Sequence, residues 1–234
     1  MTRCSHAAAA VHACLWLLIV LGVPGAEASP ERDRERAEAQ LDRVSVHFEA
    51  LQSDPARSVP PEILRDALGV VVVRETRAGF ILGGKGGRGA MVLRDGRGWT
   101  APVFVRTREG GVGLQAGWQN ATFVQVLMSP AAVEAVRTNQ FRFGVGLRVT
   151  SGPRTLGDEA KTKSKGADVL LYADTGGLYG GLALEGGSLR PEEGWNRDLY
   201  GMEADAVLFG TRPGASPAGR RLVALLERFS GDPK

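Results

Sequence analysis

The stretch Gly69-Val70-Val71-Val72-Val73 decides the fold, because four β-branched residues follow a glycine without a polar interruption. Such a run is typical of a strand that is buried on both faces. Before it, Pro61 suits the first turn of a short helix over residues 62–68, and Gly69 ends that helix. After it, short apolar runs alternate with glycine as far as Glu185, and Asp95-Gly96 indicates a hairpin turn. We expect further strands near residues 79–83, 88–94, 99–106, 111–118, 121–128, 143–150, 168–172 and 178–185.

Two Ser-Pro pairs mark the starts of helices. Ser129-Pro130 and Ser216-Pro217 each place an N-cap serine before a proline at the first helical position. The first pair predicts a helix to about Arg137, and the second predicts the last helix of the chain. One face of that last helix would carry Leu222, Leu225, Leu226 and Phe229. The predicted fold class is therefore α+β, with an antiparallel Gly-rich β-sheet or barrel-like core packed with N-terminal, central and C-terminal helices.

Three of the expected strands carry small residues on one face or both. Glycine recurs at alternate positions in residues 111–118 and 143–150, and residues 178–185 have small residues on both faces. On these faces glycine leaves the backbone without side chains. The structural interpretation is that another layer packs closely on the sheet there, or that the sheet is strongly curved. The functional interpretation is a groove that admits an acyl chain.

Residues 31–52 are predicted to form an amphipathic helix. Its apolar residues recur at spacings of three and four, which places them in one stripe. The stripe consists of Ala37, Leu41, Val44, Phe48 and Leu51. One interpretation is a helix that packs on its own domain. The other is a helix that lies on a membrane surface, with Leu41, Val44, Phe48 and Leu51 in contact with lipid.

The first 28 residues are predicted to be a secretory signal peptide. Arg3 provides a positive start, an apolar run follows over residues 15–23, and Ala26-Glu27-Ala28 forms a cleavage signal. This segment holds both cysteines and two of the three histidines, so the exported chain would keep only His47. Disulfides, thiolate nucleophiles and Cys-based or multi-His metal sites are thereby excluded. Export without cysteines indicates a bacterial periplasm.

Neither charge nor motifs indicate nucleic-acid binding or catalysis. The formal net charge of the 234 residues is only +3. Residues 84–89 satisfy G-x-G-x-x-G, but a predicted strand follows instead of a helix, so a pyrophosphate would lack a helix N-terminus. No nucleophile motif or selected pair of carboxylates appears. We expect no catalytic residue, no metal and no cofactor, and an enzyme that uses paired carboxylates is an alternative.

Two groups of cations are candidate sites for an anion. The first comprises Arg74, Arg77, Lys85 and Arg88, with Arg106 and Arg108 following in the sequence. The second comprises Lys161, Lys163 and Lys165. Cations near an anionic membrane each contribute about 1 kcal/mol. We expect these groups to bind an anionic headgroup, and the alternative is a solvated charged surface.

An ordered set of motifs resembles the SYLF-domain family over about residues 44–229. The set comprises residues 60–64, 69–73, Trp99-Thr100-Ala101-Pro102, Gly113-x-Gln115-x-Gly117, residues 177–181, Asn196 and Tyr200-Gly201. The resemblance implies binding instead of catalysis, because SYLF domains bind phosphoinositides and other anionic lipids. Some eukaryotic members also bind actin filaments. The chain departs from the family pattern at Arg74, Thr122, Gly146 and Ala173.

We therefore expect an exported periplasmic protein, peripheral to a membrane, that binds anionic phospholipid with phosphoinositide-type headgroups. Its expected organisation is a signal peptide (1–28), an amphipathic helix (29–57), a SYLF-like domain (58–229) and a tail (230–234). The alternative is a structural or protein-interaction module of the cell envelope without a lipid ligand. We expect another envelope protein as a further partner and no nucleic acid. We do not expect actin as a partner of an exported bacterial protein.

Overall fold

The computed structural model describes residues 29–79, 82–112, 117–142, 145–153, 159, 162, 164–174, 188–211 and 213–231. The expected signal peptide and the expected strand 178–185 lie outside these residues. The described helices are α2 (Pro30–Gln52), α3 (Pro61–Asp66), α4 (Pro130–Arg137), α7 (Glu193–Tyr200), α8 (Ala204–Phe209) and α9 (Pro217–Ser230). The described strands are β1 (Gly69–Gly79), β2 (Leu82–Asp95), β3 (Gly98–Trp99), β4 (Val103–Val112), β5 (Gly117–Leu127), β6 (Val149–Ser151), β7 (Val169–Ala173) and β8 (Ser188–Pro191).

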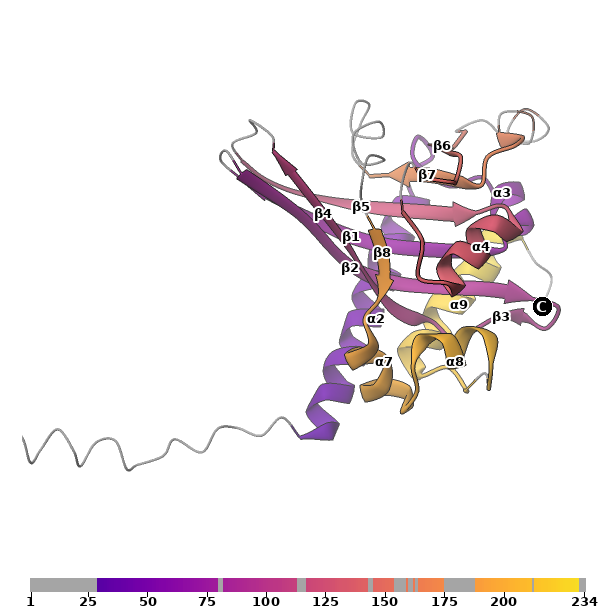
Figure 1. Ribbon diagram of the computed structural model, residues 1–234. Coiled ribbons are helices and arrows are strands. Elements are labelled where there is room, and N and C mark those ends of the chain that lie inside the picture. Colours follow the sequence, from indigo (N-terminus) through magenta and orange to yellow (C-terminus); the bar gives the residue numbers. More distant parts are fainter. Residues whose placement is uncertain are drawn as a thin grey trace, which may run out of the picture.

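The described strands form one mixed sheet in the order β6-β7-β5-β1-β2-β4-β8, and β3 pairs with β2. All neighbours are antiparallel except β6 and β7. The valine run lies in the central strand β1, where residues 70–73 are buried as predicted. The α+β class is confirmed, and the sheet is open instead of closed into a barrel (Figure 1).

Several strand boundaries differ from the sequence prediction. Of the predicted strand over residues 79–83, Gly79 ends β1, Leu82 and Gly83 begin β2, and residues 80 and 81 lie outside the described part of the chain. The predicted strand over 143–150 is wrong, because residues 145–147 are bends and β6 begins only at Val149. Gly146 has a φ of +74°, a left-handed conformation that breaks extended backbone and that glycine adopts without strain. The sequence prediction also missed β8, α7 and α8.

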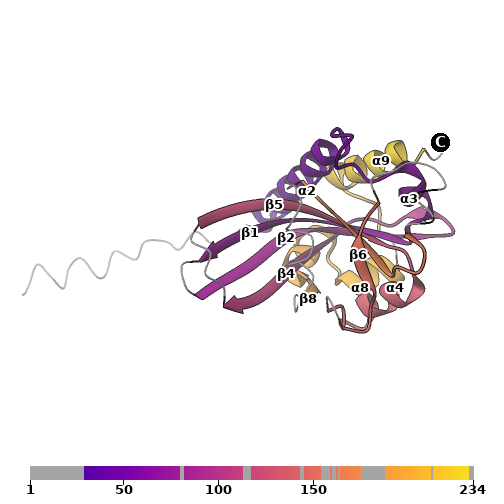
Figure 2. The same ribbon diagram turned by 90° about the horizontal axis from the view of Figure 1, so that it is seen from above.

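Helices cover both faces of the sheet. Figure 2 shows α2 and α9 on one face and α4 and α8 on the opposite face. Even-numbered residues of β1, such as Val70 and Val72, pack in the cluster that contains α2 and α9. Odd-numbered residues, such as Val71 and Val73, pack in the cluster that contains α4 and α8. We call these two sides the α2 face and the α4 face, and the alternation follows from the two-residue period of a strand.

Helix α2 belongs to the core of the domain. Its N-cap Ser29 accepts a hydrogen bond from the Arg32 N–H, and Pro30 occupies the first turn. Phe48 meets Phe229 of α9 edge-to-face, with 5.9 Å between ring centroids. The four side chains expected to contact a membrane are instead 0 to 3% exposed: Leu41, Val44, Phe48 and Leu51. The structure corrects that expectation in favour of packing on the domain, because the sheet and α9 cover the apolar stripe.

Polar contacts also fasten α2 to α9. The Glu38 carboxylate accepts hydrogen bonds of 3.0 Å from the Ser216 hydroxyl and from the Ala218 N–H, at the start of α9. Farther along, Arg228 of α9 pairs with Glu49 at 2.8 Å. Among the described helices, none combines the length and the apolar character that a membrane crossing requires.

Candidate anion-binding site

Four arginines lie opposite one another on four adjacent strands. Arg74 pairs with Arg88 across β1 and β2, and Arg88 pairs with Arg106 across β2 and β4. Arg106 in turn pairs with Arg190 across β4 and β8. Directly opposed residues point to the same face of a sheet, so these side chains form one row on the α2 face. We call them the arginine row, and their mutual repulsion is a cost that a purely structural sheet would avoid.

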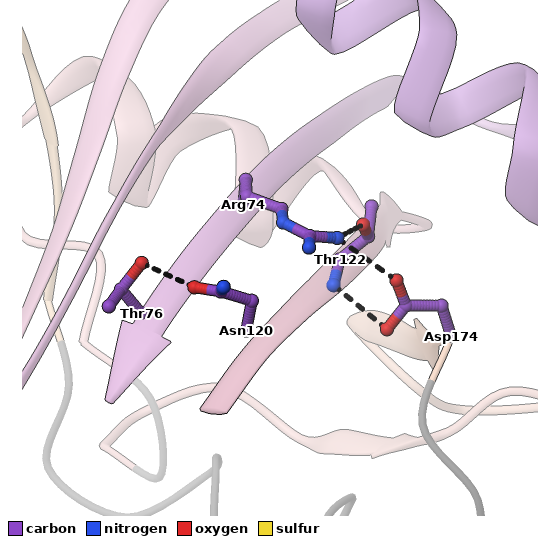
Figure 3. A network of polar contacts seen from close by, with 5 residues as sticks. All are labelled: Arg74, Thr76, Asn120, Thr122 and Asp174. Atoms are coloured by element: carbon purple, nitrogen blue, oxygen red, sulfur yellow. Dashed lines mark hydrogen bonds and ion pairs between the residues drawn. The ribbon is translucent and has the colours of Figure 1, made fainter. Parts of the chain in front are cut away.

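Asp174 and Thr122 hold one end of the arginine row. An Nη1–H of Arg74 donates to Thr122 Oγ1 at 3.0 Å, and the same Nη1 lies 3.4 Å from Asp174 Oδ2. The other carboxylate oxygen of Asp174 accepts the Thr122 N–H at 2.9 Å (Figure 3). Next to this group, the Thr76 hydroxyl donates to Asn120 Oδ1 at 2.8 Å. Arg74 and Thr122, two of the four departures from the family pattern, are therefore direct partners.

Glu192 forms ion pairs with the two arginines in the middle of the arginine row. It lies just before α7 and pairs with Arg106 at 3.4 Å and with Arg88 at 3.9 Å. The guanidinium of Arg88 also lies 5.7 Å from the centre of the Trp195 ring, a cation–π distance. Arg190 is exposed, and no carboxylate among the described residues pairs with it. Among the described residues, the arginines of the row therefore outnumber their carboxylate partners.

A cavity of about 270 Å³ opens beside Arg106 and Arg190. Four residues line it: Arg106, Arg108, Ser188 and Arg190. Arg108 and Ser188 are cross-strand partners on β4 and β8, one step beyond the arginine row on the same face. The buried Nε of Arg106 has no hydrogen-bond partner. We call this cavity the arginine pocket, and three converging guanidiniums make it suited to an anion.

His47 of α2 lies near the Arg74 end of the row. Burial lowers the pKa of His47 below 6.5, the Arg74 and Arg43 charges lower it further, and Asp174 partly offsets them. The imidazole is therefore neutral at pH 7 and adds no charge to the row.

The α7 motif residues position the groups beside the row. The buried Asn196 side chain accepts the Phe104 N–H at 2.7 Å and donates to the Phe104 carbonyl at 3.3 Å. The Tyr200 hydroxyl donates to the Pro102 carbonyl at 2.8 Å, and burial raises the pKa of this phenol. Gly201 ends α7 with a φ of +67°. These bonds fix α7 against β4 and thereby place Glu192 and Trp195 beside the arginines.

The structure brings together only part of the predicted cation groups. Arg74 and Arg88 belong to the arginine row, whereas Arg77 and Lys85 pair across β1 and β2 with side chains outside the described part of the structure. Lys161 and Lys163 also lie outside it.

Lys165 belongs to a different end of the sheet. It is exposed and precedes β7, whose Val169 pairs with Leu127, and Leu127 pairs with Gly69. Arg74 is five residues farther along β1 from Gly69. Lys165 and the arginine row therefore lie toward different ends of the sheet.

Arg190 and Ser188 were not predicted as site residues, because the sequence pattern predicts no strand over residues 188–191. Arg106 and Arg108 were recognised only as cations near one another in the sequence. Their alternate spacing was a signal that both point to one face, but only the register of β4 with β8 shows what lies opposite them.

Comparisons with known proteins identify the family of the chain. A family model described as Ysc84, Las17-binding protein actin regulator, matches residues 108–229. The chain belongs to this Ysc84 (SYLF) family. The resemblance to SYLF domains that the sequence motifs indicated is thereby confirmed. No solved structure matches the chain.

Relatives of the Ysc84 family occur in yeasts and animals. A Schizosaccharomyces pombe protein named SH3 domain-containing protein PJ696.02 is 36% identical over 68% of this chain and 38% of its own length. The human SH3 domain-containing YSC84-like protein 1 is 30% identical over 76% of this chain and 54% of its own length. Protein YSC84 of Saccharomyces cerevisiae is 28% identical over 72% of this chain and 37% of its own length. The matched part of the chain thus covers between about two fifths and just over half of the length of these curated relatives.

The expectation that excluded actin as a partner is wrong. The family description names an actin regulator, and Saccharomyces cerevisiae relatives are named LAS seventeen-binding protein 3. These names indicate actin-related partners within the family.

Proposed function

We propose that the protein binds anionic phospholipid headgroups, of the phosphoinositide type, at a membrane surface through the arginine row. The observation that carries this proposal is the cross-strand alignment of Arg74, Arg88, Arg106 and Arg190 on one face. Arginine suits this task because its planar guanidinium donates two parallel hydrogen bonds to a phosphate.

The charge balance supports the same conclusion. Together with Arg108, the row presents five guanidiniums, and the described carboxylates that pair with them are Asp174 and Glu192. An uncompensated cation near an anionic membrane contributes about 1 kcal/mol, and this contribution falls within a Debye length. Binding is therefore expected to weaken as salt rises. The apolar stripe of α2 makes no contribution, because it is buried.

Vesicle flotation tests the proposal. The full chain should float with vesicles of phosphatidylcholine containing phosphatidylglycerol or a phosphoinositide, and not with phosphatidylcholine alone. Arg190→Gln should lower partitioning about fivefold, the equivalent of about 1 kcal/mol. Arg97→Gln is the matched control, since Arg97 is an exposed arginine in the turn after β2, nine residues beyond Arg88.

Equal flotation, or its absence, with neutral and anionic vesicles would overturn the proposal. If Arg97→Gln and Arg190→Gln lowered vesicle partitioning equally, lipid binding could not be assigned to the arginine row. The loss would then follow from the lower net charge of either variant.

We further propose that the protein is exported and acts in a periplasm, at the surface of a membrane. The positive start, short apolar run and Ala26-Glu27-Ala28 signal support this location. N-terminal sequencing of the protein from fractionated cells should find Ser29 at the start of the chain. A chain that keeps Met1 in the cytoplasm would overturn the proposal.

Binding of actin filaments, or of a Las17-type protein, is a second candidate function. The names of the family and of its yeast relatives favour it. Co-sedimentation with actin filaments, and pull-down of the Las17-type partner for which those relatives are named, would test it. Pelleting with filaments at physiological salt would support it, and recovery in the supernatant together with no capture in the pull-down would contradict it.

A further inference from the structure

We infer that the arginine pocket takes a dianionic phosphate, that is, a phosphomonoester, in preference to a singly charged phosphodiester. The inference deepens the proposed function and rests on it where the phosphate belongs to a lipid. The chemistry is the same for a lipid headgroup and for a soluble phosphomonoester.

The lining of the arginine pocket carries the inference. Arg106, Arg108 and Arg190 converge from two adjacent strands, and Ser188 adds a hydroxyl beside them. Guanidinium and hydroxyl groups both donate hydrogen bonds to phosphate oxygens. Arg142 lies opposite Ser188 in an isolated antiparallel bridge, so a fourth arginine lies at the same edge of the sheet.

The charge of the arginine pocket favours a dianion. Glu192 pairs with Arg106 at 3.4 Å and is shared with Arg88 at 3.9 Å, whereas no carboxylate among the described residues pairs with Arg108 or Arg190. Among the described residues, the three guanidiniums of the pocket therefore outnumber their carboxylate partners. A phosphomonoester carries about −1.5 to −2 charges at pH 7, so it offsets this excess of positive charge better than a phosphodiester with a single negative charge.

The arginine pocket has room for a phosphate. The cavity of about 270 Å³ accommodates the phosphate and the first atoms of its ester. The Arg106 side chain that lines the cavity is 35% exposed, although its Nε is buried.

Titration calorimetry of the full chain at pH 7.5 tests the phosphate preference directly. Methyl phosphate should bind at least about tenfold more tightly than dimethyl phosphate, because it forms more charge-assisted hydrogen bonds. Arg108→Gln should weaken methyl phosphate binding about tenfold, and Arg97→Gln should leave it unchanged. Arg190→Lys keeps the charge but loses the planar fork, so it should show an intermediate loss.

Flotation separates the two sources of the phosphate. Vesicles of phosphatidylcholine with phosphatidic acid should bind the protein about tenfold better than vesicles of equal surface charge with phosphatidylglycerol. Methyl phosphate should compete with the phosphatidic acid vesicles.

These experiments can contradict the phosphate preference of the arginine pocket and the proposed lipid binding separately. Equal binding to the two anionic vesicles, with equal affinity for methyl and dimethyl phosphate, would overturn this inference and leave the proposed lipid binding in place. Binding of methyl phosphate without any vesicle binding would support the arginine pocket, assign it a soluble phosphomonoester, and overturn the proposed membrane function. Unchanged methyl phosphate affinity in Arg108→Gln, measured on a folded variant, would also overturn the inference.

Discussion

Two rows of residues on the α2 face of the sheet lie only two positions apart and differ completely in chemistry. The first row is apolar and joins Val72, Ala90 and Phe104 across β1, β2 and β4, each 1% exposed. The second joins Arg74, Arg88 and Arg106 on the same strands. Two residues of a strand span about 7 Å. The core of this domain therefore ends within one step of the arginine row.

The helices decide where the change occurs. Trp195 of α7 packs on Phe104 edge-to-face, with 5.4 Å between ring centroids, and so covers the apolar row. Glu192, just before the same helix, pairs with Arg88 and Arg106 of the cationic row. The first residues of α7 and the residue before it therefore cover the end of the apolar core and contact the first charged residues beyond it. The comparison shows that the folding of the core positions the candidate site.

The largest expected effect comes from the apolar row. Phe104→Ala should lower the free energy of unfolding by about 3–5 kcal/mol, because it removes a buried aromatic ring and leaves a cavity. Arg190→Gln, on the neighbouring row, should change that free energy by less than about 0.5 kcal/mol. Urea denaturation followed by circular dichroism measures both. A large loss of stability in Arg190→Gln would show that the cationic row is part of the structural core.

A smaller effect is expected at the end of the arginine row. A double-mutant cycle with Arg74→Gln and Asp174→Asn should give a coupling energy below about 1 kcal/mol, because both side chains are about one-third exposed. The same urea titration measures it, and salt should reduce it. A coupling energy well above this value would identify the pair as a main structural tie between β1 and the end of β7.

The smallest effect concerns His47 at the border between the two rows. Its pKa is below 6.5 in the folded protein, chiefly because of burial and then because of the Arg74 charge. The fold therefore favours the neutral imidazole, and this stability is complete above pH 6.5 and decreases as the pH falls below 6.5. Between pH 7.5 and 5.5 the urea midpoint should fall more in the wild type than in His47→Gln. Equal falls would show that other groups cause the pH dependence.

Elements with a local signal in the sequence could be predicted from the sequence alone. The caps Ser129 and Ser216 begin α4 and α9 as predicted, and each hydroxyl accepts a hydrogen bond from an N–H in the first turn. The apolar stripe of α2 correctly indicated a helix, but the stripe alone did not distinguish a core from a membrane. Only the contact with α9 decides between them.

The candidate site depends on long-range pairing, and so the sequence could not provide it. Arg74 and Arg190 are 116 positions apart and share a row only because β1, β2, β4 and β8 have one particular register. The strand β8 lacks a clear alternation, since Ser188, Leu189, Arg190 and Pro191 form only four residues. Arg74 and Thr122 both depart from the family pattern, but nothing in the sequence indicates that they share a site, and only the structure shows their hydrogen bond.

Nuclear magnetic resonance of the arginine Nε–Hε groups during titration with anionic lipid nanodiscs would show which arginines contact the membrane. We expect the signals of Arg88, Arg106 and Arg190 to change first and to saturate together. Signals of Arg34 and Arg36, which are exposed on the N-terminal half of α2, should stay unchanged in the same titration. If the signals of those α2 arginines changed while the signals of the arginine row did not, the membrane would contact the N-terminal helix and not the arginine row.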